Sequence, residues 1–164
     1  MEIISAGSDA LLKLTAEIAE EIWRQHFAGI IAAGQIEYML EKFQSYEAMK
    51  KQVSDEKYRY YLIKDENNSY QGYFAIAPMK DYMFLSKIYI RQASRGKGYA
   101  GKALEFIKDS ARKENLINIV LTVNRNNTET VNIYKKMNFE ITGEADKDIG
   151  GGFFMNDYIM SLGV

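Results

Sequence analysis

A glycine-rich, basic segment from Ser94 to Lys102 carries the residue types best suited to bind a phosphate. It lies between a strand-like run, Leu85–Ile90, and a run with helical spacing, Ala103–Lys113. The first N–H groups of a helix lack partners within the helix, and residues without bulky side chains let an anion approach them. The segment also supplies three cations, Arg95, Lys97 and Lys102. We therefore expect an anion site where strand becomes helix.

The glycine spacing differs from that of the common nucleotide loops. Gly96, Gly98 and Gly101 match a dinucleotide pattern, but no carboxylate ends the next predicted strand, Ile117–Val123, as that site requires. No Gly-Lys pair is followed by Ser or Thr, which argues against a P-loop. The alternative to phosphate binding is a helix start at which the glycines serve only the turn.

Composition limits the class of protein. The 164 residues are 47% hydrophobic, which suits a single domain over residues 1–164. The 21 basic and 22 acidic side chains nearly cancel, so we expect no nucleic-acid or membrane partner. No run is apolar enough to span a bilayer, and with no cysteine we expect a cytoplasmic protein. We expect no metal site, because His26 is the one histidine, and a packing or surface role suits it better.

Periodicity along the chain predicts a mixed α/β architecture. Helical spacing indicates helices over Asp9–Phe27, Gln35–Phe43, Tyr46–Val53, Ala103–Lys113 and Thr128–Met137. Strand-like runs cover Tyr58–Ile63, Gln71–Ala77, Tyr82–Ile90, Ile117–Val123, Phe139–Glu144 and Phe153–Leu162. Helices, then antiparallel strands, then a crossover α/β part indicate one mixed sheet in an α/β domain.

Two motifs in this order resemble the GNAT N-acetyltransferase superfamily. Its signature Arg/Gln-x-x-Gly-x-Gly/Ala is met by Arg95, Gly98 and Ala100. The segment Asn127 to Phe139 resembles the family's Asn-x-x-Ala-x-x-x-Tyr-x-Lys-x-Gly-Phe at the same spacing. The resemblance implies a GNAT-like fold, in which a mixed, mostly antiparallel central sheet is flanked by helices.

The resemblance also implies acetyl-CoA as the cofactor. The glycine loop would hold the pyrophosphate on backbone amides, and the pantetheine arm would pair with the edge of the preceding strand as an added strand. A splay or bulge in that strand would free a backbone N–H to stabilise the oxyanion. The residues expected to bind the cofactor are Ile88, Tyr89, Ile90, Arg95, Gly96, Lys97, Gly98, Tyr99, Ala100, Gly101, Lys102 and Asn127.

Tyr134 is the catalytic residue that the resemblance implies, because the family uses the matching tyrosine to protonate the departing thiolate. On residue type alone, core packing is the better interpretation of Tyr134, and a helix N-cap is the more common role for an asparagine placed like Asn127. Several family members place a glutamate near Ser86 as general base, so this chain leaves the base unassigned. Asn138 replaces a usual glycine, and asparagine tolerates the positive φ of that turn.

We expect the acceptor to be a small-molecule primary amine of polyamine type. Its expected ligands lie in the second helical pattern and the last strand: Glu37, Tyr38, Asp157 and Tyr158. The alternatives are a non-catalytic acyl-CoA-binding or regulatory module, and an acetyltransferase of a protein lysine or N-terminus. The sequence leaves the oligomeric state open, with a homodimer as one option.

Overall fold

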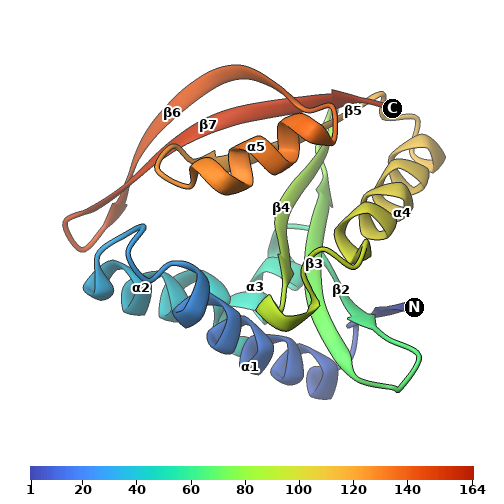
Figure 1. Cartoon of the computed structure of the whole chain (residues 1–164), viewed down its shortest axis with the longest axis horizontal. Coiled ribbons are helices and arrows are strands. Elements are labelled where there is room, and N and C mark those ends of the chain that lie inside the picture. Colours follow the sequence, from blue (N-terminus) through green and yellow to red (C-terminus); the bar gives the residue numbers. More distant parts are fainter.

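A seven-stranded sheet runs through the computed structural model, which describes all 164 residues (Figure 1). Its strands are β1 (Glu2–Ser5), β2 (Arg59–Lys64), β3 (Tyr70–Pro78), β4 (Met83–Ile90), β5 (Asn118–Asn124), β6 (Glu140–Gly150) and β7 (Phe153–Gly163). Their spatial order is β1-β2-β3-β4-β5-β7-β6, and only the β4–β5 pair is parallel. The predicted mixed, mostly antiparallel sheet is thus confirmed.

Five α-helices and two short helical segments complete the chain. They are α1 (Asp9–His26), α2 (Ala33–Met39), the π-helical turn η1 (Leu40–Gln44), α3 (Tyr46–Asp55), the 3₁₀ turn η2 (Gln92–Ser94), α4 (Tyr99–Lys113) and α5 (Thr128–Lys136). The segment Gln35–Phe43, predicted as one helix, therefore spans most of α2 and the π-helical turn η1. Strand β1 was not predicted, because four residues are too few to show a period. No helix is long and apolar enough to cross a membrane.

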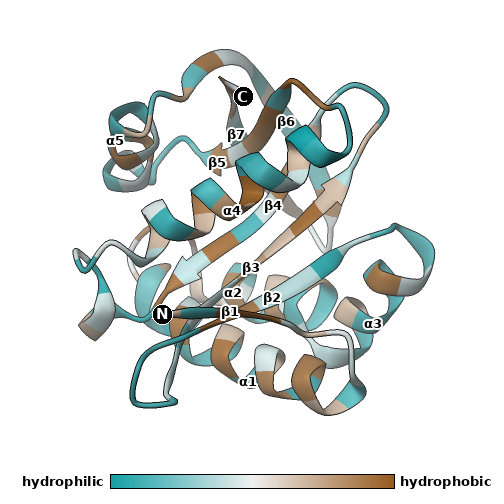
Figure 2. Cartoon of the chain, turned by 90° about the vertical axis from the view of Figure 1, so that its right-hand side faces the viewer, coloured by the Kyte–Doolittle hydropathy of each residue, from teal (hydrophilic) through white to brown (hydrophobic).

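The two faces of the sheet pack against different helices. Helices α4 and α5 cover one face, and alternate residues of β2 and β3, such as Ile63 and Phe74, pack there with Ile107 of α4. Helices α1 and α3 cover the other face, where Leu62 and Tyr73 lie in a second core cluster. In Figure 2 helices α1 and α3 lie below the sheet and α4 lies in front of it. Because successive side chains of a strand point to opposite faces of the sheet, β2 and β3 each contribute apolar residues to both core clusters.

Strand β4 leaves the regular ladder at two places. Its pairing with β5 is limited to Met83 with Ile119 and Phe84 with Val120, after which the strands separate. Its register with β3 shifts so that Ser86 has no partner, which is a β-bulge. The bulge and the splay that the resemblance implied for this strand are both present. From Leu85 onward, the β4 edge that faces β5 is therefore free.

The glycine loop leads from η2 into α4. Gly96 and Gly98 have φ angles of 75° and 82°, and Gly98 is the residue that precedes the helix. Only glycine adopts this left-handed region without strain. Helix α4 then packs on the sheet through Ala103, Ile107 and Ala111, which fixes the position of its first turn.

Candidate active site

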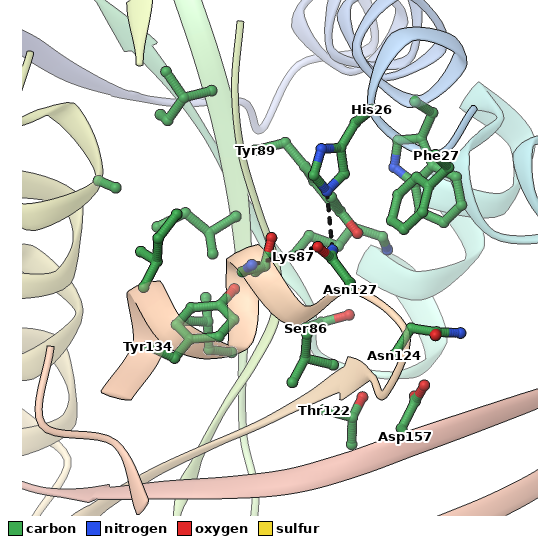
Figure 3. Close-up of a pocket in the computed structure, with 18 of the residues that line it drawn as sticks. His26, Phe27, Ser86, Lys87, Tyr89, Thr122, Asn124, Asn127, Tyr134 and Asp157 are labelled. Atoms are coloured by element: carbon green, nitrogen blue, oxygen red, sulfur yellow. Dashed lines mark hydrogen bonds between the residues drawn. The ribbon is translucent and has the colours of Figure 1, made fainter. Parts of the chain in front are cut away.

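The splay of β4 from β5 opens a cleft of about 880 Å³. Most of the residues predicted from the sequence to form the site line it: Ile88, Tyr89, Ile90, Arg95, Gly96, Gly98, Tyr99, Ala100, Gly101, Asn127, Tyr134 and Asp157. Figure 3 shows side chains that line the cleft converging from α1, β4, β5, α5 and β7. The chain therefore brings together segments that are far apart in the sequence.

The first turn of α4 has the geometry of an anion cradle. No side chain caps this helix, and the N–H groups of Tyr99, Ala100 and Gly101 have no backbone partner. A Cβ built on Gly96 or Gly98 would meet no atom within 4 Å, so the space beside the loop is open. Free donors at a positive helix end and an open approach fit a pyrophosphate group.

The three loop cations differ in position. The Arg95 side chain borders the cleft and donates a hydrogen bond of 3.3 Å to the carbonyl oxygen of Ile90. Lys97 and Lys102 are exposed and do not line the cleft. They contribute positive charge near the loop but make no contact that fixes them to it.

His26, which the sequence did not single out for this site, joins the glycine loop to the start of α5. Its Nδ1 lies 3.2 Å from the Arg95 guanidinium, and its Nε2 lies 3.0 Å from the Asn127 amide nitrogen, as Figure 3 shows for Asn127. A guanidinium only donates, so Nδ1 must accept. Burial and the charge of Arg95 lower the pKa of His26, which keeps the imidazole neutral. No sequence pattern relates three residues this far apart.

Asn127 caps helix α5. Its side-chain oxygen lies 3.4 Å from the backbone nitrogen of Thr130, and its remaining amide nitrogen faces His26. The residue is buried and lines the cleft. Its cap role is observed, and its contact with the cofactor stays a prediction.

Tyr134 projects from α5 toward the cleft. Its ring packs edge-on against Phe139, with the ring centroids 5.5 Å apart. Its hydroxyl has no hydrogen-bond partner within the protein, and burial raises its pKa. A protonated hydroxyl that faces a cleft without an internal partner can donate to a bound molecule.

Asp157 lies across the cleft on β7, opposite Asn124 of β5. It is only 5% exposed, yet no lysine or arginine lies within ion-pair distance of its carboxylate. The nearby Arg125 pairs instead with Glu144 and Asp146. Burial raises the pKa of Asp157 to about 6. This carboxylate is available to a ligand cation.

The other three residues predicted to bind the acceptor lie outside the cleft. Glu37 forms an exposed ion pair with Arg24. The Tyr38 hydroxyl donates to the carbonyl oxygen of Ile149 at 2.6 Å, and so ties α2 to the β6–β7 hairpin. Tyr158 packs against the core, because neighbouring residues in a strand point to opposite faces and Asp157 already faces the cleft.

Lys87 is a further cleft residue that the sequence did not single out. It is 5% exposed, and its Nζ donates to Gln52 Oε1 at 2.8 Å and to the Tyr60 hydroxyl at 2.5 Å. The bulge at Ser86 explains its position. Leu85 packs on the α4 face, and the extra residue turns Lys87 to the face covered by α3.

Comparison with solved structures identifies this architecture. The PaiA N-acetyltransferase of Thermoplasma acidophilum, in complex with coenzyme A, is 20% identical with a TM-score of 0.75 over 100% of both chains. A GCN5-related N-acetyltransferase from Rhodopseudomonas palustris is 11% identical with a TM-score of 0.81, over 99% of this chain and 95% of that one.

A mutant form of the spermidine N-acetyltransferase SpeG from Vibrio cholerae is 16% identical with a TM-score of 0.67 over 99% of this chain and 92% of that chain. No curated protein matches the sequence. The model of the acetyltransferase (GNAT) family matches residues 15–139, most of the chain and both sequence motifs. The protein therefore belongs to the GNAT family of acetyltransferases, enzymes that use acetyl-CoA.

Proposed function

We propose that this enzyme transfers the acetyl group of acetyl-CoA to the primary amine of a small molecule, by direct attack of the amine. The observation that carries the proposal is the single cleft that joins the α4 cradle to the unpaired carboxylate of Asp157. One end of this cleft suits a pyrophosphate, and the other suits a cationic amine.

The cofactor would be held mainly by backbone groups. The first turn of α4 would bind the pyrophosphate, and the free edge of β4 would pair with the amide groups of the pantetheine arm. The bulge leaves only Ser86 out of the ladder with β3, and the separation of β4 from β5 frees the other edge of β4, so a backbone N–H near Tyr89 can face the thioester oxygen. The cofactor supplies an activated acetyl group as a thioester.

Tyr134 would act as the general acid. A primary amine that displaces a thiolate leaves a strongly basic sulfur, which a positioned proton donor stabilises. The raised pKa of Tyr134 keeps its hydroxyl protonated at neutral pH, and the lack of an internal partner leaves it free to donate. The edge-on contact with the Phe139 ring fixes the orientation of the Tyr134 side chain.

A polyamine is the acceptor class we propose. Structural similarity to spermidine N-acetyltransferases supports it, although at 16–17% identity that similarity concerns the fold. Asp157 supports it independently, since a buried carboxylate without a cation is stabilised by a ligand ammonium. The rings of Tyr58, Phe43 and Trp23 add apolar walls suited to an alkyl chain.

A panel of amines, assayed for release of coenzyme A thiol, tests the proposal. The panel contains spermidine, putrescine, neutral-tailed monoamines, amino acids and a lysine-containing peptide. We expect turnover with the small amines and the highest kcat/KM with a polyamine. Turnover confined to the peptide would indicate a protein substrate, and tight acetyl-CoA binding without any turnover would indicate a binding module.

A further inference from the structure

Lys87 is a buried amine in the wall of the acetyl-transfer cleft that no acidic group neutralises. It lines the cleft beside the bulge at Ser86, and no carboxylate lies within 4 Å of its Nζ. Glu56, at the end of α3, acts on it only from a longer distance. Buried lysines are costly unless they are paired or neutral, so its position needs a reason.

The hydrogen bonds around Lys87 leave one position on its nitrogen free. The Tyr60 hydroxyl donates to Gln52 Oε1, so Lys87 donates to both of these oxygens rather than accepting from either. Two of the three substituent positions on Nζ are thereby used. The third has no partner in the protein, and because Lys87 lines the cleft, an acceptor amine can reach it.

We propose that Lys87 is the general base that takes the proton from the acceptor ammonium. The inference rests on the proposed function, because it supplies the step that an alkylamine requires. Such an amine has a pKa of about 10.4, so at neutral pH it enters the cleft as an ammonium ion. An ammonium ion has no lone pair and cannot attack a thioester. A neutral lysine nitrogen with a free position can accept that proton.

The surroundings of Lys87 suit both of its protonation states. Burial lowers its pKa to about 7, so at neutral pH the lysine is neutral in a large share of the molecules. Once it is protonated, the rings of Tyr58 and Tyr60, with centroids 5.2 and 4.9 Å from Nζ, stabilise the cation, as does Glu56. The other charged side chains that line the cleft are Asp157, Glu129, Lys147 and Arg95.

Three other titratable residues of the cleft, Asp157, His26 and Tyr134, suit different roles. Asp157, with a pKa of about 6, is the weaker base, and as a carboxylate it suits binding an ammonium. Both nitrogens of His26 already face Arg95 and Asn127. Tyr134 holds its proton too firmly to act as a base. Among these four residues, Lys87 combines a free position on its nitrogen with a pKa near neutral pH.

The protons balance over one turnover. One acceptor proton passes to Lys87, and the neutral amine forms the C–N bond as the C–S bond breaks. The nitrogen then loses a second proton, Tyr134 gives its proton to the thiolate, and the proton lost by the nitrogen restores that of Tyr134. Lys87 releases its proton to solvent, so the net reaction yields an amide, a thiol and one proton.

The variant Lys87→Arg separates a base from a structural cation. Arginine retains the positive charge and the donors but does not deprotonate in proteins. We expect kcat/KM for ethylamine or spermidine at pH 7 to fall about 100-fold or more, with unchanged acetyl-CoA affinity by calorimetry. In the wild type, kcat/KM should rise with pH through about pH 7. In Lys87→Arg, this rise should shift toward the pKa of the free amine. Lys64→Arg, in strand β2 and outside the cleft, is the matched control.

A matched pair of acceptors makes the test specific. Fluorination makes 2,2,2-trifluoroethylamine mostly neutral at pH 7, so it needs no base, and the ratio of wild-type to variant rates should approach one with it. Equal losses for ethylamine and its fluorinated analogue would show a structural role and overturn the inference. So would wild-type rates for Lys87→Arg with ethylamine. Failure of the wild type to acetylate any amine would overturn the proposed function and, with it, this inference.

Discussion

The two ends of the cleft are built in different ways. The end that we propose for the cofactor comes mainly from one continuous stretch, β4 to α4, and offers backbone N–H groups and a free strand edge. The end that we propose for the acceptor takes single side chains from separate elements, among them Lys87 of β4, Gln52 of α3 and Asp157 of β7. A backbone site depends on chain conformation, whereas a side-chain site depends on the tertiary arrangement.

The difference also concerns charge. The cofactor loop is exposed, so its cations remain hydrated and cost the fold little. Lys87 and Asp157 are each only 5% exposed and have no opposite charge within ion-pair distance. Groups of this kind are expensive to bury and mark functional sites more often than structural ones. Substitutions at the two ends should therefore act on different quantities.

The largest effect is expected from Gly98→Asp at the cofactor end. A side chain there would enter the open space beside the α4 amides, and a carboxylate would repel the pyrophosphate. Calorimetry should detect no acetyl-CoA binding. Gly29→Asp is the control, because Gly29 also has a positive φ with nothing within 4 Å of a Cβ but lies outside the cleft. Equal affinity in both variants would remove the cradle assignment.

The second effect, on turnover, is expected from Tyr134→Phe. Loss of a general acid lowers the rate of the chemical step by roughly 10²–10⁴-fold. The ring and its contact with Phe139 remain, so acetyl-CoA affinity should stay close to that of the wild type. Single-turnover kinetics with a good acceptor isolates the chemical step. A wild-type rate in that assay would show that water or another group protonates the thiolate.

The same contrast explains what the sequence could predict. The residues predicted to bind the cofactor lie mainly in one contiguous stretch, so glycine spacing could single them out, and element order together with the two motifs predicted the fold. Tyr38 and Tyr158 were expected at the acceptor, but one ties a hairpin and the other packs against the core. Nothing local distinguishes Asp157 from Tyr158 as the one that faces the cleft.

Two residues needed the three-dimensional structure. Regular alternation would place Lys87 on the same face as Leu85, and only the bulge at Ser86 turns it toward Gln52. His26 lies in an amphipathic helix beside aromatic residues, where packing was the reasonable interpretation. Its contacts with Arg95 and Asn127 follow from how α1 lies against η2 and α5.

A smaller effect, on acceptor binding, is expected from Asp157→Asn. Loss of a charged hydrogen-bond partner costs about 1.5–3 kcal/mol, so KM for spermidine should rise roughly 10- to 100-fold. KM for a neutral-tailed monoamine should change less. Because the carboxylate ionises near pH 6, the wild-type KM for spermidine should fall as pH rises through 6, and the variant should lack this dependence. Equal changes for both acceptors would place the ammonium elsewhere.

The smallest effect concerns the stability of the protein without ligands. The pKa of Asp157 is about 6 in the fold against an ordinary value of 3.8, so between these pH values the native state binds more protons than the unfolded state. Stability therefore falls as pH rises through this window, and the cost of the buried charge is complete above pH 6. Asn does not ionise, so Asp157→Asn should raise Tm by a few degrees at pH 7.5.

That gain should shrink as pH falls and disappear below 3.8, where the wild-type carboxyl is protonated in both states. Thermal unfolding across this pH range measures it, and Asp81→Asn, at an exposed position in the turn between β3 and β4, should show no such trend. A lower Tm for Asp157→Asn at pH 7.5 would mean that the fold itself needs the carboxylate. A higher Tm combined with a higher KM would show that this charge is kept for the acceptor at the expense of stability, a compromise that the hydrated cations of the cofactor loop do not require.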